Sequence, residues 1–306
     1  MNKEKEQLAS STLRLLKSIY NLLKSNNLHV FSVYPPGHFS SPIPNIRDIF
    51  SRKEALFDQS VRDIPGVDLR EQQQINLLQA LSEYYVELPF TPNSIGPRRY
   101  YYENDFFSYG DAIILFSMLR HYRPRRVIEI GSGFSSAVML DTKELFLGDS
   151  IDLTFVEPNP DRLLGLLKDN PEDECYLIQE RIQDIDLSEV ESLDENDFLF
   201  VDSSHVLKVH SDVGYIIFHI LPRLKRGVIV HFHDIPWPFE YPREWLRKGI
   251  IWNEAYFLRS FLQYNTAFPI LYFNAYIHQF HRELLGQKMP LCLRNPGGSL
   301  WLKKAI

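Results

Sequence analysis

Apolar positions follow two different spacings along this chain, and the spacing changes near Arg126. Before that point apolar residues recur every three or four positions, which predicts amphipathic helices over about 5–25, 69–86 and 106–122. The proline-rich residues 35–44 interrupt the pattern and predict a loop. From Arg126 onward short apolar strands alternate with helical segments, an order typical of a parallel sheet covered by helices.

The strands of the second part are short apolar runs. They are predicted at 127–130, 151–157, 175–179, 198–201 and 228–231. Between the last two, aliphatic residues at three- and four-residue spacing predict a helix with one buried face: Val206, Val209, Val213, Ile216 and Ile220. A strand, a helix and a strand of this length form a right-handed parallel crossover, so both strands end at the same edge of the sheet.

Side chains suited to metal binding or proton transfer follow the two strands that this crossover joins. Asp202 and His205 come after the first strand, and His233 and Asp234 come after the second. Ligands of open α/β sheets bind at the edge formed by the carboxyl ends of the strands. We therefore expect these four side chains to share one site, although the two pairs lie far apart in the sequence.

The first strand leads into the segment GSGFSSAVML, in which a helix is expected from about Ser135. Gly131 and Gly133 permit a tight turn and let the backbone approach a ligand closely. The third glycine of the dinucleotide-binding fingerprint is absent, because Ser136 stands in its place. Glu157 ends the second strand, where an acid is placed to accept hydrogen bonds from ribose hydroxyls.

Taken together, the segments EIGSG, FVEP, QDI, FVDSSH and GVIVHFHDI resemble class I S-adenosylmethionine-dependent methyltransferases. The resemblance covers about Tyr109 to Ile306 and implies an α/β, Rossmann-like methyltransferase fold. In that fold a seven-stranded, mostly parallel sheet ends in an antiparallel hairpin, for which 268–273 and 299–303 are the candidate strands. We expect two parts, a helical N-terminal extension or lid over 1–105 and the methyltransferase domain over 106–306.

The resemblance also implies where S-adenosylmethionine binds. The glycine loop of the family holds the methionine part of the cofactor, and the acid after the second strand holds its ribose. Gln183 and Asp184 correspond to the adenine contact, and Tyr109 is expected to approach the methionine end. The predicted cofactor-binding residues are therefore Glu129, Gly131, Ser132, Gly133, Glu157, Gln183, Asp184 and Tyr109. Ser135 stands where many members have a further glycine.

The acceptor side resembles the catechol-type O-methyltransferases, which use a divalent metal and a base. By that resemblance Asp202, His233 and Asp234 are the metal ligands, and His205 with Asp202 is the catalytic pair. The metal is Mg, Mn, Zn or Fe, and a histidine ligand favours the transition metals over Mg. In the alternative without a metal, Asp202 and Asp234 cap helices or contact the cofactor, and His205 still serves as the base.

The expected reaction is O-methylation of a hydroxyl on a small metabolite or glycoside. Two other functions stay open: a metal-dependent hydroxylase-like relative with the same fold, and a noncatalytic cofactor-binding or scaffold protein. The loop after the last parallel strand carries Trp237, Phe239, Tyr241 and Trp245, which form either an acceptor wall or plain core. His231 is expected to point to the opposite face of its strand.

Charge and composition remove several classes of partner. The net charge is -6, and no basic stripe is present, so nucleic acid is not an expected partner. The two cysteines are too few for a disulfide framework and fit a reducing compartment. No signal peptide and no membrane span is recognised. We therefore expect a cytoplasmic enzyme with a small-molecule acceptor and no membrane partner, and homo-oligomerisation stays open.

Overall fold

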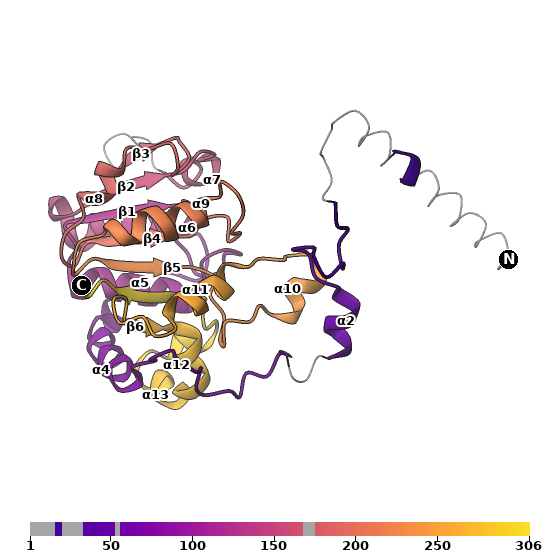
Figure 1. Ribbon diagram of the computed structural model, residues 1–306. Helices are drawn as coiled ribbons and strands as arrows, with labels where there is room; N and C mark the ends of the chain where they lie inside the picture. The colour runs from indigo at the N-terminus through magenta and orange to yellow at the C-terminus, as the bar shows by residue number, and fades with distance from the viewer. Residues whose placement is uncertain (1–15, 20–32, 53–55, 168–174) are drawn as a thin grey trace. The chain divides into compact units, whose positions relative to one another are not determined.

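The computed structural model describes residues 16–19, 33–52, 56–167 and 175–306, which fall into two compact units, Met1–Phe57 and Asp58–Ile306 (Figure 1). In the first unit α2 (Ile46–Ser51) begins after Asn45, whose side chain accepts hydrogen bonds from the backbone of Arg47 and Asp48. The predicted helix over 5–25 lies mostly outside the described residues.

The second unit is built around a seven-stranded sheet in the order β3-β2-β1-β4-β5-β7-β6 (Figure 1). The strands are β1 (Arg126–Ile130), β2 (Asp152–Val156), β3 (Tyr176–Ile178), β4 (Phe198–Val201), β5 (Ile229–Phe232), β6 (Ile270–Phe273) and β7 (Leu300–Lys303). The first five strands are parallel, and β7 runs antiparallel to both of its neighbours. The predicted sheet with its C-terminal antiparallel hairpin is confirmed.

Every residue of β4 and of β5 is buried, which is why neither strand alternates apolar with exposed polar residues, and His231 is the one polar residue of the two. Helices alternate with the strands. They are α4 (Glu71–Leu81), α5 (Tyr109–Tyr122), α6 (Phe134–Thr142), α7 (Asp161–Leu164), α8 (Leu187–Glu191), α9 (Asp212–Tyr215), α10 (Arg243–Arg247), α11 (Glu254–Leu262), α12 (Asn274–Phe280) and α13 (Arg282–Lys288). None of the helices in the described residues is long and apolar enough to cross a membrane.

The helix between β4 and β5 begins later than the apolar spacing predicts. Ser211 caps α9 by accepting a hydrogen bond from the backbone of Gly214, and the helix continues through a π-helical turn over Ile216–Ile220. Val206 precedes the helix, and Val209 is 97% exposed. Residues 203–211 therefore form a loop at the carboxyl end of β4, and this loop carries His205.

Residues 58–105 fall in the same compact unit as the sheet, so the predicted domain boundary at 105/106 lies inside that unit. The Gln74 side chain of α4 accepts a hydrogen bond from the backbone of Phe273 at the end of β6, at 2.8 Å. Glu71, also on α4, contacts His281 at 2.7 Å, and in Figure 1 α4 lies beside the C-terminal helices α12 and α13. The role of the N-terminal region as a lid stays a prediction.

Candidate active site

The loops after β1 and β4 meet at the carboxyl edge of the sheet. Gly131 has φ +85°, and a Cβ atom placed there would lie 1.7 Å from the carbonyl oxygen of Asp202. The Gly131 N–H donates to Val156 O at 3.0 Å, and the Asp202 N–H donates to Ile130 O at 2.9 Å. Only glycine suits position 131, because its backbone is left-handed and the next strand end leaves no space for a side chain.

Glu129 lies beneath the glycine loop and is fully buried. Its carboxylate accepts hydrogen bonds from the hydroxyls of Ser135, at 2.5 Å, and Ser136. The Ser136 hydroxyl in turn accepts from the Gly133 N–H at 2.9 Å. Burial raises the pKa of Glu129 to about 8, although the hydrogen bonds from Ser135 and Ser136 act in the opposite direction and lower it. Glu129 thus supports the glycine loop through the two serines, and its predicted contact with the cofactor stays a prediction.

Glu157 joins the loops after β1 and β2. Its carboxylate accepts hydrogen bonds from the Ser132 N–H at 3.2 Å and from the Asn159 N–H at 2.8 Å. Gln183 lines the same region, and its amide donates to His210 O at 3.0 Å. Asp184, by contrast, is exposed and accepts from the Arg181 guanidinium at 2.7 Å. The structure therefore brings Glu157 and Gln183 together with the glycine loop and leaves Asp184 outside.

Three cavities lie in series along this edge. The first, of about 350 Å³, is lined by Gly131, Glu157 and Gln183 among others. The second, of about 360 Å³, shares Glu157, Asp202, Ser203 and Ser204 with the first. The third, of about 350 Å³, shares Phe106, His233 and Asp234 with the second. His233 and Asp234 therefore lie at the junction between the second and third cavities, and Asp202 and His205 line the second cavity beside them.

His205 is held beside that junction by carboxylates on both ring nitrogens. Its Nδ1 lies 2.9 Å from Glu254 Oε2, and its Nε2 lies 3.4 Å from Asp202 Oδ1 and 3.8 Å from Asp234 Oδ2. The ring of Trp252 packs against the imidazole with centroids 4.2 Å apart. Because both Glu254 and His205 are almost fully buried, the imidazole cannot reorient without losing these contacts.

Two residues of this centre have left-handed backbone, with φ 58° at His205 and φ 56° at Asp234. Such conformations persist in non-glycine residues only where the surrounding structure enforces them, and they concentrate at functional sites. Here the N–H groups of Asn253 and Glu254 both donate to His205 O at 3.2 Å. The start of α11 therefore fixes the backbone of His205 as well as its side chain.

The electrostatics of the centre favour protonated histidines. Burial alone lowers the pKa of His205, but Asp202 and Glu254 outweigh it and raise the pKa to about 10. Burial likewise lowers the pKa of His233, and Asp234, Asp202 and the buried Asp111 raise it to about 9. Burial raises the pKa of Asp202, but the two histidines, His233 first, hold it below the ordinary value.

The predicted metal ligands do not form a finished metal site. Among the described residues, no group of three or more His, Cys, Asp and Glu side chains is arranged to hold an ion. Within the predicted set, His233 Nε2 lies 3.6 Å from Asp234 Oδ1. The donor chemistry, imidazole nitrogen with carboxylate oxygen, suits Zn, Mn or Fe. The set therefore has suitable ligands, held in this structure by ion pairing between histidines and carboxylates.

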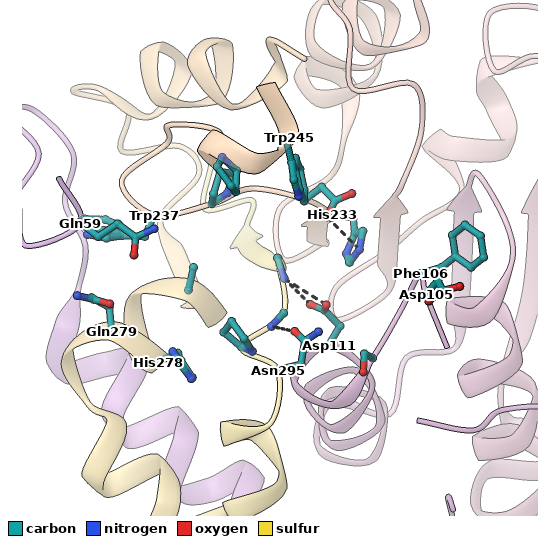
Figure 2. Close-up of a pocket in the computed structure, with 18 of the residues that line it drawn as sticks. Gln59, Asp105, Phe106, Asp111, His233, Trp237, Trp245, His278, Gln279 and Asn295 are labelled. Carbon is teal, nitrogen blue, oxygen red and sulfur yellow. Dashed lines mark hydrogen bonds and ion pairs between the residues drawn. The ribbon is translucent and has the colours of Figure 1, made fainter. Parts of the chain in front are cut away.

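The third cavity opens beside this centre, and Figure 2 shows its labelled side chains arranged around one space. Trp237 and Trp245 from the aromatic loop line it, while Phe239 and Tyr241 do not. The last two are 1% and 0% exposed and belong to the core. Trp245 thus fits the acceptor-wall interpretation, whereas Trp237 lines the cavity and, at 3% exposure, also belongs to the core.

Tyr109 and His231 differ from the sequence predictions. The Tyr109 hydroxyl donates to Glu103 at 2.7 Å, its ring stacks on Tyr102, and it lines neither of the first two cavities. The prediction that Tyr109 approaches the methionine end therefore has no support in its contacts. The sequence predicts His231 on the opposite face, yet its ring lies 5.8 Å from that of His233 and hydrogen-bonds to Ser299 Oγ at 2.9 Å.

Two buried acids of the site are not predicted from the sequence. Glu254 binds His205, and Asp111 accepts hydrogen bonds from the Ser299 hydroxyl at 2.6 Å and from the backbone of Gly298 and Ser299. A single carboxylate within the apolar run YGDAIILF is the one available signal for Asp111. Burial raises the pKa of both acids above the ordinary values.

Comparisons with known proteins agree with this architecture. Residues 128–235 match the family described as a methyltransferase domain. A protein of Archaeoglobus fulgidus, described as uncharacterized, is 36% identical over 192 residues, which cover 60% of this chain and 85% of the relative.

Two solved structures are also similar to this chain, at low sequence identity. The first is the S-adenosylhomocysteine-bound methyltransferase PaMTH1 of Podospora anserina, with 14% identity, TM-score 0.41, and coverage of 88% of this chain and 100% of that one. The second is the O-methyltransferase TomG of Streptomyces achromogenes, involved in tomaymycin synthesis, with 13% identity, TM-score 0.42, and coverage of 85% and 96%.

The matched segment runs from β1 to the end of β5 and so contains the glycine loop, the acid after β2 and the ends of β4 and β5. The strand order, with its antiparallel β7, is that implied by the resemblance. The chain belongs to the class I S-adenosylmethionine-dependent methyltransferases. It is an enzyme of the methyltransferase class, and its methyl donor is S-adenosylmethionine.

Proposed function

We propose that the protein transfers the methyl group of S-adenosylmethionine to a hydroxyl group of a small-molecule acceptor. The observation that supports this reaction is the position of His205, a buried imidazole between Asp202 and Glu254 that lines the second cavity 3.8 Å from Asp234, which lines both the second and the third. A base beside the junction between donor and acceptor cavities is what methyl transfer to a hydroxyl requires.

The residues of the first two cavities fit the cofactor. Glu157 offers carboxylate oxygens for the ribose hydroxyls, and Gln183 offers an amide for the adenine edge. The hydroxyls of Ser132 and Ser203 are buried and have no hydrogen-bond partner among the described residues, and both residues line the second cavity. Buried polar atoms of this kind need a partner, and polar groups of the cofactor would supply it. When bound, the cofactor supplies an electrophilic methyl group.

The reaction forms one bond from the acceptor oxygen to the methyl carbon, and the sulfur–carbon bond breaks. The acceptor hydroxyl must lose its proton, and we assign that proton to Nε2 of His205, the ring nitrogen that faces Asp202 and Asp234. Glu254 on Nδ1 fixes the tautomer with its proton on Nδ1 and stabilises the imidazolium that forms. Asp202 then positions the base.

A metal-assisted form of this reaction is part of the proposal. Asp202, His233 and Asp234 would hold the ion, which would lower the pKa of the acceptor hydroxyl. Because His233 must first lose its proton, and its pKa is about 9, we expect affinity for Mn²⁺ to rise with pH and binding to release a proton. Calorimetry of chelator-treated protein with Mn²⁺ in buffers of different ionisation enthalpy measures both. Affinity that does not change with pH would exclude His233 as a ligand of the ion.

The proposed function is tested by incubating the protein with isotope-labelled S-adenosylmethionine and a set of hydroxylated acceptors. Products with an added methyl ether are identified by mass spectrometry and NMR. In the variant His205→Asn we expect transfer to fall by about 10²–10⁴-fold, the usual contribution of a general base. S-adenosylhomocysteine binding should be retained, since asparagine tolerates the left-handed backbone at position 205. Methyl groups found only on nitrogen or sulfur would contradict the proposal.

A further inference from the structure

The third cavity is lined by more acidic than basic side chains. Among the described residues, no lysine or arginine lines it, and its acidic side chains are Asp105, Asp111 and Asp234. The two histidines of the wall are both engaged, since His233 is paired with Asp234 at 3.6 Å and Nε2 of His278 accepts a hydrogen bond from the Arg282 guanidinium at 2.8 Å. A phosphate or carboxylate on the acceptor would therefore meet like charge without a cationic partner. A neutral acceptor avoids this cost.

Aromatic and apolar surface forms part of the wall. Trp237 is 3% exposed, and its indole N–H donates to Val61 O at 2.8 Å, so the side chain offers ring carbons to the cavity rather than a polar group. Trp245, Pro236 and Pro242 line the same space. Such surface packs against the C–H faces of a ligand and contributes area without demanding charge.

Hydrogen-bonding groups with spare capacity complete the cavity. In the described part of the chain, the side-chain amides of Gln59 and Gln279 have no hydrogen-bond partner, and Asn295 uses only its oxygen, which accepts from Gly297 N–H at 2.8 Å. By contrast, Asn104 is fully used by backbone groups of the chain. A side-chain amide both donates and accepts, which suits hydroxyl groups.

From these features we propose that the acceptor is a neutral saccharide, which rests on the O-methyl transfer proposed above. Its ring would contact Trp237 and Trp245, its other hydroxyls would meet Gln59, Gln279 and Asn295, and the reacting hydroxyl would face the His205 centre. The cavity of about 350 Å³ is near the lower end of ligand pockets, which suits a single sugar residue.

The experiment uses the full chain with labelled S-adenosylmethionine and a panel of neutral methyl hexopyranosides. Methyl β-D-glucopyranoside and methyl β-D-glucuronide form a matched pair that differs in one carboxylate, and catechol represents planar phenols. We expect a methyl ether on at least one neutral glycoside of the panel, and none on the glucuronide or catechol. Transfer to catechol or glucuronide with no neutral glycoside methylated would overturn the saccharide proposal.

Variants of the cavity separate this proposal from the underlying reaction. We expect Trp245→Ala to raise the KM of the best glycoside about tenfold, because a factor of that size corresponds to the loss of roughly one net hydrogen bond or packing contact. The affinity for S-adenosylhomocysteine should stay unchanged. Gln279→Lys should make the matching uronide a better substrate, because it adds a cation to the wall. Gln287→Lys, on α13 and outside the cavity, is the matched control and should change neither the KM of the glycoside nor the activity toward the uronide.

The two failures can be told apart. If S-adenosylhomocysteine binds but no saccharide is methylated, the acceptor class is wrong and the methyltransferase reaction stands. If S-adenosylhomocysteine does not bind, the proposed function itself fails.

Discussion

Among single residues, the environment of His205 decides how the site handles a proton. Carboxylates on both ring nitrogens favour the imidazolium, with a pKa of about 10. A base must be neutral before it can accept a proton, so the fraction of active enzyme grows as pH rises toward that pKa. With His205 as the proposed base, we therefore expect the ion pairs that hold the imidazole in place to shift activity toward alkaline pH.

Replacing Glu254 by glutamine tests this environment. The change removes one charge that stabilises the imidazolium, so the pKa of His205 should fall and the acid limb of the kcat/KM profile should move to lower pH. The displacement should be about one pH unit or more, since a charged hydrogen bond contributes about 1.5–3 kcal/mol. Glu244→Gln, at an exposed position of α10, is the control and should leave the profile in place. An unmoved limb in Glu254→Gln would mean that another group titrates.

At the scale of elements, the approach of the β1 and β4 ends shapes the cofactor site. Gly131→Ala places a Cβ 1.7 Å from the carbonyl oxygen of Asp202 and also strains a backbone with φ +85°. We expect the free energy of unfolding, measured by urea denaturation, to fall by about 3–5 kcal/mol. The loss is large because the contacted atom belongs to the backbone of Asp202, which cannot rotate away as a flexible side chain could.

Gly96 provides a matched comparison, since it has the same φ of +85° but a Cβ atom added there would have nothing within 4 Å. Gly96→Ala should therefore destabilise the fold by only about 1 kcal/mol, the cost of the left-handed conformation alone. Equal losses in the two variants would show that the close approach of the two loops contributes nothing.

The sequence predicts the strands of this edge well, because buried parallel strands are continuous apolar runs with polar ends. The sequence predicts the start of α9 too early, because Val206 and Val209 fit helical spacing by chance. Both residues precede the helix, in a loop that is held by groups distant in the sequence. One of these is Asn253, whose side chain accepts from the Leu207 N–H at 2.7 Å.

The same reason explains the missed acids. Glu254 lies 49 residues from His205, and Asp111 lies 188 residues from Ser299, so no local pattern in the sequence reveals either contact. The strand-end residues Asp202, His205, His233 and Asp234 could be predicted as one group because the crossover rule places them at one edge.

For the molecule as a whole, buried ionisable groups should make stability depend on pH. The pKa of His205 rises from 6.5 to about 10 on folding, that of His233 from 6.5 to about 9, and that of Glu129 from 4.5 to about 8. In each case the folded state binds the proton more tightly, so stability is fully present below the unfolded pKa and is lost as pH rises through the folded value.

The free energy of unfolding, measured by denaturant titration across this range, should therefore decline between about pH 6.5 and pH 10. In His205→Asn the decline should be smaller, because one of the titrating groups is gone. A wild-type stability that increases across the same interval would contradict the protonated histidine centre.

The most direct test of the account is calorimetric titration of the chelator-treated full chain with S-adenosylhomocysteine, repeated with Mg²⁺, Mn²⁺ or Zn²⁺. We predict binding at micromolar concentration. In Glu157→Ala the binding free energy should weaken by about 1–3 kcal/mol, because two hydrogen bonds to the ribose are removed. Asp184→Ala, outside the cavity, should bind like the wild type. Binding that is unchanged in Glu157→Ala would contradict the cofactor position, and no binding under any condition would contradict the methyltransferase account itself.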